Sequence, residues 1–204
     1  MKSYIIIYGL IFCFLTGFSQ AKGTFKDPRD GKIYKTVKID SQTWMAENLA
    51  YKAKSGSRAF NNDEKNVPKY GRLYVWNTAN SVCPTGWHLP DYEEWEKLVD
   101  SLGGGPVAGG KMKAVTLWNS PNVAATNSSG FSALPGGAVD GKGVFTGVVF
   151  PNQTGSLGSI AYFWTATPSE NGKAWLCFLG NFNGTIYLEE YSYDTGCSVR
   201  CKKD

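Results

Sequence analysis

The sequence has 204 residues, 14% of them aromatic, and its 21 Lys and Arg residues against 17 Asp and Glu give a formal net charge of +4. The basic residues are scattered among acidic ones without forming a stripe, so the charge pattern argues against a nucleic-acid partner. His88 is the only histidine, which excludes zinc sites built on two or three histidines.

The first 21 residues are predicted to be a secretory signal peptide. Lys2 precedes an apolar run over residues 4–18, and Ser19-Gln20-Ala21 supplies small residues at the two positions that a signal peptidase recognises. A transmembrane anchor is the alternative, but the run is shorter than the roughly 18 to 20 residues that span a bilayer. We therefore expect residues 22–204 to be exported as one domain without a membrane span, at a formal charge of +3 once Lys2 is removed.

Two strands in a hairpin are predicted near the start of the exported chain. Residues 33–39 alternate β-branched or aromatic residues with lysines, as a half-buried strand does. After a turn at Asp40-Ser41-Gln42, residues 43–46 return as the partner strand. Residues 52–69 lack periodicity and are rich in Lys, Ser, Gly and Asn, which predicts an exposed loop.

One helix is predicted after Pro90. Asp91 and Glu94 form an Asp-x-x-Glu capping box, which fixes the helix start. Apolar residues then recur at spacings of three and four, as expected for a stripe that faces a core: Trp95, Leu98, Val99 and Leu102. Gly103-Gly104-Gly105 is expected to end the helix.

Residues 106–159 are predicted to be a long irregular region, rich in Gly, Asn, Ser and Pro with isolated apolar anchors such as Phe150. Such regions commonly carry binding surfaces, and the alternative is a rigid, self-packed loop. Here one flat aromatic ring and three amides offer the stacking and hydrogen-bonding groups that a sugar requires, so the candidate ligand-binding residues are Trp118, Asn119, Asn122 and Asn127. The competing interpretation of Trp118 is a core anchor.

Four further strands are predicted toward the C-terminus, over residues 161–166, 173–179, 185–188 and 196–201, separated by Gly/Asn turns. They are expected to form one antiparallel sheet. With a helix in the middle and strands at both ends, the fold class is α+β.

The exported chain contains four cysteines, which are Cys83, Cys177, Cys197 and Cys201. An even number in an exported protein predicts two disulfides, and three connectivities are possible. A bridge from Cys83 to Cys201 would tie the middle of the chain to its end and stabilise by roughly 4 to 5 kcal/mol in the chain-entropy model.

No arrangement of residues predicts catalysis. His88 lies between Trp87 and Leu89 and is interpreted as structural. Cys197 and Cys201 would be about 13 Å apart on a strand, beyond the roughly 7 Å that a bridge or shared metal allows. We therefore expect a protein that is not an enzyme and has no catalytic residues, metal or cofactor.

Several motifs resemble the Fibrobacter succinogenes major paralogous domain family over residues 24–204. They are Arg29-Asp30-Gly31-Lys32-x-Tyr34, Gln42-Thr43-Trp44-Met45-Ala46-Glu47-Asn48-Leu49, Tyr70-Gly71-Arg72-Leu73-Tyr74, Cys83-Pro84-x-Gly86-Trp87-His88-Leu89-Pro90, Gly130-Phe131-Ser132-Ala133-Leu134-Pro135-Gly136-Gly137 and Ser198-Val199-Arg200-Cys201. The resemblance implies an exported or surface protein of a Gram-negative bacterium with a C-type-lectin-like fold. Because Cys83 and Cys201 match family positions, it also implies the pairs Cys83–Cys201 and Cys177–Cys197.

The resemblance implies a binding module whose loop region holds a glycan or an envelope or extracellular protein. Lectins of that fold place calcium with Glu-Pro-Asn or Gln-Pro-Asp and Trp-Asn-Asp triplets, which this sequence lacks, and Pro151-Asn152-Gln153 offers no carboxylate. One alternative is a structural or adhesion protein of the cell envelope, with Tyr187, Tyr191 and Tyr193 as an adhesive patch. Another is an enzyme, since the run from Leu89 to Glu96 is similar to the helix start of formylglycine-generating, sulfatase-modifying domains.

Overall fold

The computed structural model describes residues 21–145 and 157–204. Most of the predicted signal peptide, the anchor Phe150 and the segment Pro151-Asn152-Gln153 lie outside these ranges. Within them, the protein is a mixed α+β structure with antiparallel sheets and few helices. No helix in the described ranges is long and apolar enough to cross a membrane.

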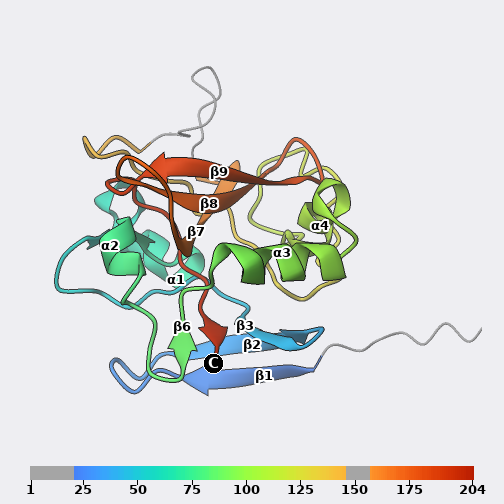
Figure 1. The fold of residues 1–204 in the computed structure, drawn as a ribbon, viewed down its shortest axis with the longest axis horizontal. Coiled ribbons are helices and arrows are strands. Elements are labelled where there is room, and N and C mark those ends of the chain that lie inside the picture. Colours follow the sequence, from blue (N-terminus) through green and yellow to red (C-terminus); the bar gives the residue numbers. More distant parts are fainter. Residues whose placement is uncertain (1–20, 146–156) are drawn as a thin grey trace, which may run out of the picture.

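Strands from both ends of the chain meet in one sheet, drawn at the bottom of Figure 1. Its order is β1-β2-β3-β10-β6, with bounds β1 (Lys22–Lys26), β2 (Ile33–Ile39), β3 (Gln42–Met45), β10 (Lys202–Lys203) and β6 (Trp87–His88). The predicted hairpin is confirmed, because Thr36 of β2 pairs with Met45 of β3 and the register continues to the turn. β1 was not predicted, and it pairs with β2 at the edge of the sheet.

A second antiparallel sheet contains β7 (Ile160–Pro168), β8 (Lys173–Gly180) and β9 (Ile186–Ser192), and these confirm three of the four predicted C-terminal strands. The fourth prediction is wrong. Residues 196–201 make only isolated bridges, one of them parallel, between Phe163 and Ser198. The chain enters a strand again at β10, in the other sheet.

The predicted helix is α3 (Tyr92–Ser101), and both halves of its capping box are present. Its stripe is buried as expected, with Trp95 and Leu98 at zero exposure. The chain after Gly103 departs from the prediction, because α4 (Gly105–Met112) follows at once with Pro106 in its first turn.

The predicted loop over residues 52–69 is also partly regular. It contains β4 (Ser57–Arg58), which pairs with β5 (Leu73–Tyr74), and the 3-10 turns η1 (Phe60–Asn62) and η2 (Glu64–Asn66). The short helices α1 (Val67–Tyr70) and α2 (Trp76–Ala79) follow. Figure 1 shows α1 and α2 on one side of the molecule and α3 and α4 on the other.

In the three-stranded sheet, β7 is buried on both sides along most of its length, whereas β9 is partly exposed. Successive residues of β7 point to opposite sides, so that Tyr162 and Trp164 join one apolar cluster while Ala161 and Phe163 join the other. The second cluster contains Trp44, Trp95 and Phe131, which pack ring against ring under α3. This central sheet fixes the position of the chain segments on either side of it.

Candidate functional site

A groove of about 420 Å³ opens between the β1–β2 hairpin and the irregular chain after α4. One wall belongs to the five-stranded sheet and the turn after β3: Lys22, Gly23, Lys35, Thr36, Val37, Ala46 and Glu47. The other wall belongs to the loop: Ala114, Val115, Thr116, Asn127, Gly130, Ser132 and Leu134. Hydroxyl, amide, ammonium and carboxylate groups alternate here with apolar side chains, a lining that suits a polar ligand.

Asn127 shapes the loop wall. Its Nδ2 donates to Ser132 Oγ at 2.9 Å, and its Oδ1 accepts from the Ser132 backbone N–H at 2.9 Å. Both residues have positive φ, at 50° and 54°. Because asparagine tolerates this left-handed conformation, the amide of Asn127 closes a tight turn that presents Ser132 to the groove.

Arg200 lies fully buried beneath the loop wall. Its Nη1 donates to the carbonyls of Met45 and Phe131 at 3.1 and 2.5 Å, and its Nη2 donates to the carbonyl of Ser132 at 2.6 Å. Its Nε donates to Asn48 Oδ1 at 2.8 Å, and burial lowers the pKa of Arg200 to about 9. One guanidinium therefore links Met45, the neighbour of Ala46 in one wall, to Ser132 in the other.

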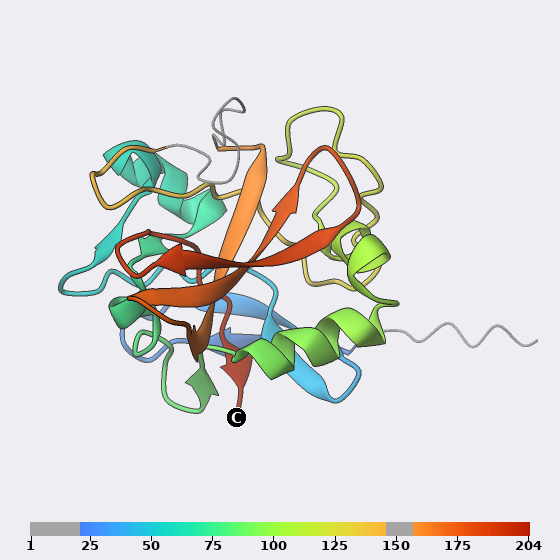
Figure 2. The same cartoon turned by 45° about the horizontal axis from the view of Figure 1, so that its top comes forward.

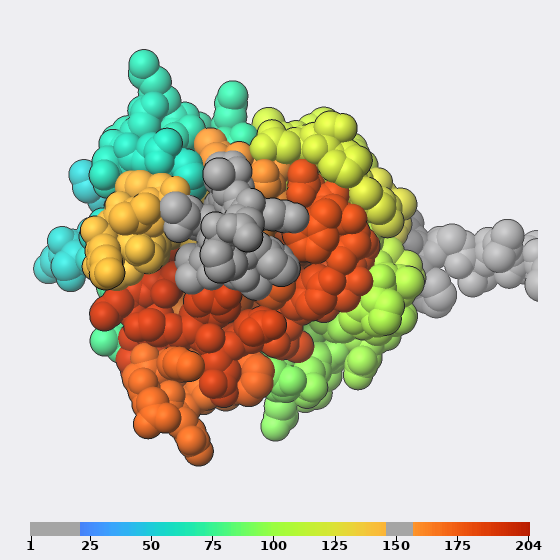
Figure 3. Space-filling model, turned by 90° about the horizontal axis from the view of Figure 1, so that it is seen from above, coloured from blue at the N-terminus to red at the C-terminus, as the bar shows by residue number. Residues whose placement is uncertain are grey.

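Lys113 performs a similar task at the other end of the loop. Its side chain is buried, and Nζ donates to the carbonyls of Val123, Gly180 and Asn183 at 2.8, 2.9 and 2.7 Å. Burial lowers the pKa of Lys113 to about 8. Figure 3 shows the result, with the loop after residue 113 lying against the turn between β8 and β9.

The candidate ligand-binding residues do not converge on one point. Trp118 is half-buried against the core, and its Nε1 donates to the Ala133 carbonyl at 3.0 Å, as an anchor would. Asn119 is exposed and donates to Ser159 Oγ at 3.1 Å. Asn122 donates to the Ala114 carbonyl at 3.1 Å.

Among the four candidates, Asn127 alone lines the groove. The sheet wall of the groove, which includes Lys35, Thr36 and Glu47, was not predicted from the sequence. No spacing rule brings these residues together with a loop that follows about eighty positions later. A ligand-binding role for Trp118, Asn119 and Asn122 stays a prediction.

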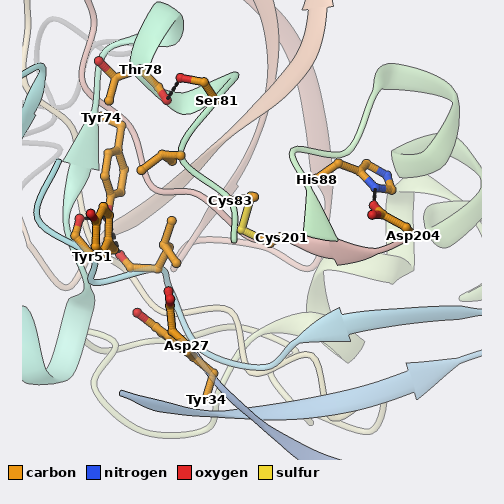
Figure 4. The surroundings of a disulfide bond; sticks show 12 residues. Asp27, Tyr34, Tyr51, Tyr74, Thr78, Ser81, Cys83, His88, Cys201 and Asp204 are labelled. Atoms are coloured by element: carbon orange, nitrogen blue, oxygen red, sulfur yellow. Dashed lines mark hydrogen bonds and ion pairs between the residues drawn. A yellow bond between two sulfur atoms is a disulfide. The ribbon is translucent and has the colours of Figure 1, made fainter. Parts of the chain in front are cut away.

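The disulfide between Cys83 and Cys201 is present, with Cα atoms 5.9 Å apart, as the family resemblance implied. Figure 4 shows it between the chain that enters β6 and the chain that enters β10. The bond closes a sequence separation of 118 residues. It therefore holds the C-terminal strand in the sheet formed by the N-terminal hairpin.

The predicted bridge between Cys177 and Cys197 is wrong, because both are free, buried thiols. Phe163 of β7 pairs with Cys177 on one side and bridges Ser198, the neighbour of Cys197, on the other. With strands about 4.8 Å apart, one intervening strand puts the two Cα atoms about 10 Å apart, beyond the roughly 7 Å limit. Burial raises the pKa of both thiols well above its usual range.

His88 is engaged at both ring nitrogens. Its Nδ1 lies 2.6 Å from Asp204 Oδ1, a pair visible in Figure 4, and its Nε2 lies 3.0 Å from Glu94 Oε2. Glu94 also pairs with Lys202 at 2.8 Å. The histidine thus connects β6 to the start of α3 and to the end of the chain, which supports the structural interpretation.

The tyrosines of the alternative adhesive patch pack against other rings. Tyr187 stacks on Phe178 with centroids 4.7 Å apart. Tyr193 stacks on Trp76 at 4.4 Å, and Tyr191 lies edge-on to Tyr162. Their aromatic faces are therefore largely committed to packing within the molecule.

In the described ranges, no group of three or more His, Cys, Asp or Glu side chains is placed to share a metal ion. The absence of a metal site from the whole chain stays a prediction.

Comparison with known proteins identifies one family. The family described as Fibrobacter succinogenes major domain has a sequence model that matches residues 37–203, which is most of the chain. Comparisons with curated proteins and with solved structures give no match.

Proposed function

The chain belongs to the Fibrobacter succinogenes major domain family, and we propose that it is a non-catalytic binding module that holds a glycan or a protein segment in the groove. One observation carries the proposal. The two walls of the groove come from distant parts of the sequence, and the buried guanidinium of Arg200 donates hydrogen bonds to Met45, beside one wall, and to Ser132 of the other. A groove held in this way is formed before a ligand arrives, which lowers the entropic cost of binding.

The proposal includes a C-type-lectin-like fold. It is supported by the sheet in which β1–β3 and β10 meet, by the central helix α3, and by the irregular chain over residues 113–145. In lectins of this fold the irregular loops carry the ligand, and here they form one wall of the groove.

The proposal also includes the absence of catalysis. Sulfatase-modifying chemistry requires a reactive cysteine pair, whereas Cys177 and Cys197 are buried with raised pKa values and Cys83 and Cys201 are bonded. Alkylation of the native protein should therefore label no cysteine, and alkylation after denaturation without reductant should label the two free ones. Rapid labelling of Cys197 in the native protein would instead support the enzyme hypothesis.

We further propose export, on the basis of the N-terminal charge, apolar run and small residues. Expression of the full chain in a Gram-negative host should yield a periplasmic or surface product that begins at or near residue 22. A cytoplasmic product that retains residue 1 would contradict export without affecting the binding proposal.

A glycan array and an array of envelope-protein peptides, probed with the exported chain with and without a calcium chelator, test the binding function. Thr116 lines the groove and is exposed, so Thr116→Trp should lower the affinity for a ligand bound there by at least tenfold while leaving the fold intact. Thr85→Trp, at an exposed position outside the groove, is the matched control. Binding that is equal in both variants would place the ligand elsewhere, and no binding on either array would refute the function.

A further inference from the structure

A second hollow, of about 310 Å³, is lined by residues at the start of α3 and at the end of β7 and shares no lining residue with the groove. Figures 1 and 2 show where α3 lies relative to the three-stranded sheet. Its walls are two aromatic rings, those of Tyr92 in the first turn of α3 and Trp175 in β8. Their centroids are 5.1 Å apart and their planes meet at 69°. Both side chains are half-buried, so the rings form a corner open to solvent.

The backbone around this corner is held by hydrogen bonds between the two elements. The Tyr92 N–H donates to Thr167 Oγ1 at 2.9 Å, and the Ala166 N–H donates to the Pro90 carbonyl at 2.8 Å. Thr167 is itself fixed by a bond from its N–H to Thr165 Oγ1 at 3.1 Å. The start of α3 and the end of β7 therefore form one preorganised unit.

The corner is acidic although the chain carries a formal net charge of +4. Glu190 lies directly opposite Trp175 in the β8–β9 ladder. Lys173, two residues before Trp175 on the same face, adds one positive charge there. Four carboxylates surround the rings, two as lining residues of the hollow and two as close neighbours: Asp91, Glu93, Glu96 and Glu190. Glu93 and Glu190 are exposed, and although Ser169 Oγ donates a hydrogen bond to Glu190 Oε1, the second carboxylate oxygen of Glu190 is left for a ligand.

We infer that this corner binds an organic ammonium group, with the rings of Tyr92 and Trp175 as two walls of a cage and Glu93 and Glu190 as its counter-charges. The face of an aromatic ring carries negative potential, so a weakly hydrated cation is attracted to two faces that meet at an angle. A sugar ring instead stacks on a flat platform, which two planes at 69° do not provide. Carboxylates at the rim add Coulombic attraction for a cation and none for a neutral sugar.

Tetramethylammonium is the probe, titrated against the exported chain at low salt and followed by the line width of the ligand's own protons. We expect saturable binding with a Kd of roughly 1 to 10 mM, as two cation–π contacts near the surface allow. Trp175→Leu keeps an apolar side chain in β8 and removes the ring, so it should weaken binding by about tenfold. Glu93→Gln should weaken binding by about threefold, whereas Asp30→Asn, at an exposed position in the turn between β1 and β2, should leave it unchanged.

Neopentyl alcohol, a neutral compound of similar size and shape, and methyl glucoside serve as competing ligands, and Tyr92→Leu is a second ring variant in case Trp175→Leu unfolds. Unchanged tetramethylammonium binding in both ring variants would overturn the inference. So would a neutral compound that binds the corner as tightly as tetramethylammonium does. Thr116→Trp should not affect this binding, so failure here and failure of the groove proposal are distinguishable.

Discussion

The sheet end of the molecule and the loop after α4 stabilise their buried backbone groups in different ways. At the sheet end, β10 pairs with β3 on one side and with β6 on the other, and the Cys83–Cys201 bond holds this last strand in place. In the loop, carbonyls that have no strand partner accept hydrogen bonds from two buried cations, Lys113 and Arg200. Buried backbone groups must be paired in either case, and irregular chain leaves that task to side chains.

This difference makes the loop dependent on few residues. Transferring a charge from water into the interior is costly unless hydrogen bonds compensate, and the carbonyls around Lys113 and Arg200 provide that compensation. The sheet end distributes the same task over many backbone bonds. We therefore expect global effects from changes at the disulfide and local effects from changes at the buried cations.

The largest effect is expected for the double variant Cys83→Ser with Cys201→Ser. Loss of a bond that closes 118 residues should lower the free energy of unfolding by about 5 kcal/mol in the chain-entropy model. Urea denaturation measures it, and the unchanged protein under reducing conditions is the control, which should behave like the variant. A loss below about 1 kcal/mol would mean that the sheet holds the C-terminal strand without the bridge.

A somewhat smaller loss, about 4 kcal/mol, is expected for Arg200→Met, because three carbonyls and Asn48 Oδ1 lose their donor inside the protein. Hydrogen exchange should accelerate more over residues 127–134 than in the β7–β9 sheet, because the loop can open without the rest of the chain. Arg200→Lys should recover only part of it, since an ammonium lacks the planar fork of donors. Uniformly faster exchange over the whole chain would contradict a local role.

Lys113→Met should lower the free energy of unfolding by about 2 kcal/mol, because the carbonyls of Val123, Gly180 and Asn183 lose their donor. The pKa of Lys113 is lowered to about 8 from 10.5, so between these pH values the unfolded state binds more protons at this position. Through this residue the free energy of unfolding therefore rises with pH between pH 8 and about 10.5, and the variant should lack that rise. Urea titrations at pH 7, 9 and 10 measure that difference, and exposed Lys65→Met is the control.

The elements that were predictable have local signals. The capping box of α3 lies within four residues, and the alternation of residues in β2 and the Gly/Asn turns on either side of β8 are equally local. The helix α4 has no such signal, because glycines at 109 and 110 disfavour a helix in isolation. They are required by packing, since a Cβ at Gly109 would lie 2.8 Å from the Gly184 carbonyl oxygen and one at Gly110 would lie 2.5 Å from that of Ala124.

The free thiols and the groove were missed for a different reason. Cys177 and Cys197 form no disulfide because β7 lies between them, and the order of strands is decided only when the sheet assembles. The groove likewise joins β2 to a loop that follows it by about eighty positions. The family motif ending in Arg200-Cys201 did mark two residues of structural importance, although only the cysteine had a predictable partner.

The smallest expected effect is that of Asp91→Ala, at the start of the regular helix. Asp91 Oδ1 accepts from the Glu94 N–H at 2.8 Å, and loss of such a cap lowers stability by about 1 kcal/mol. Asp91→Asn keeps a capping oxygen and should lose only a few tenths, which isolates the hydrogen bond from the rest of the side chain. Because Glu94 is also tied to His88 and Lys202, the helix start should stay in place in both variants. A loss for Asp91→Ala comparable to that for Arg200→Met would mean that α3, like the loop, depends on a single side chain.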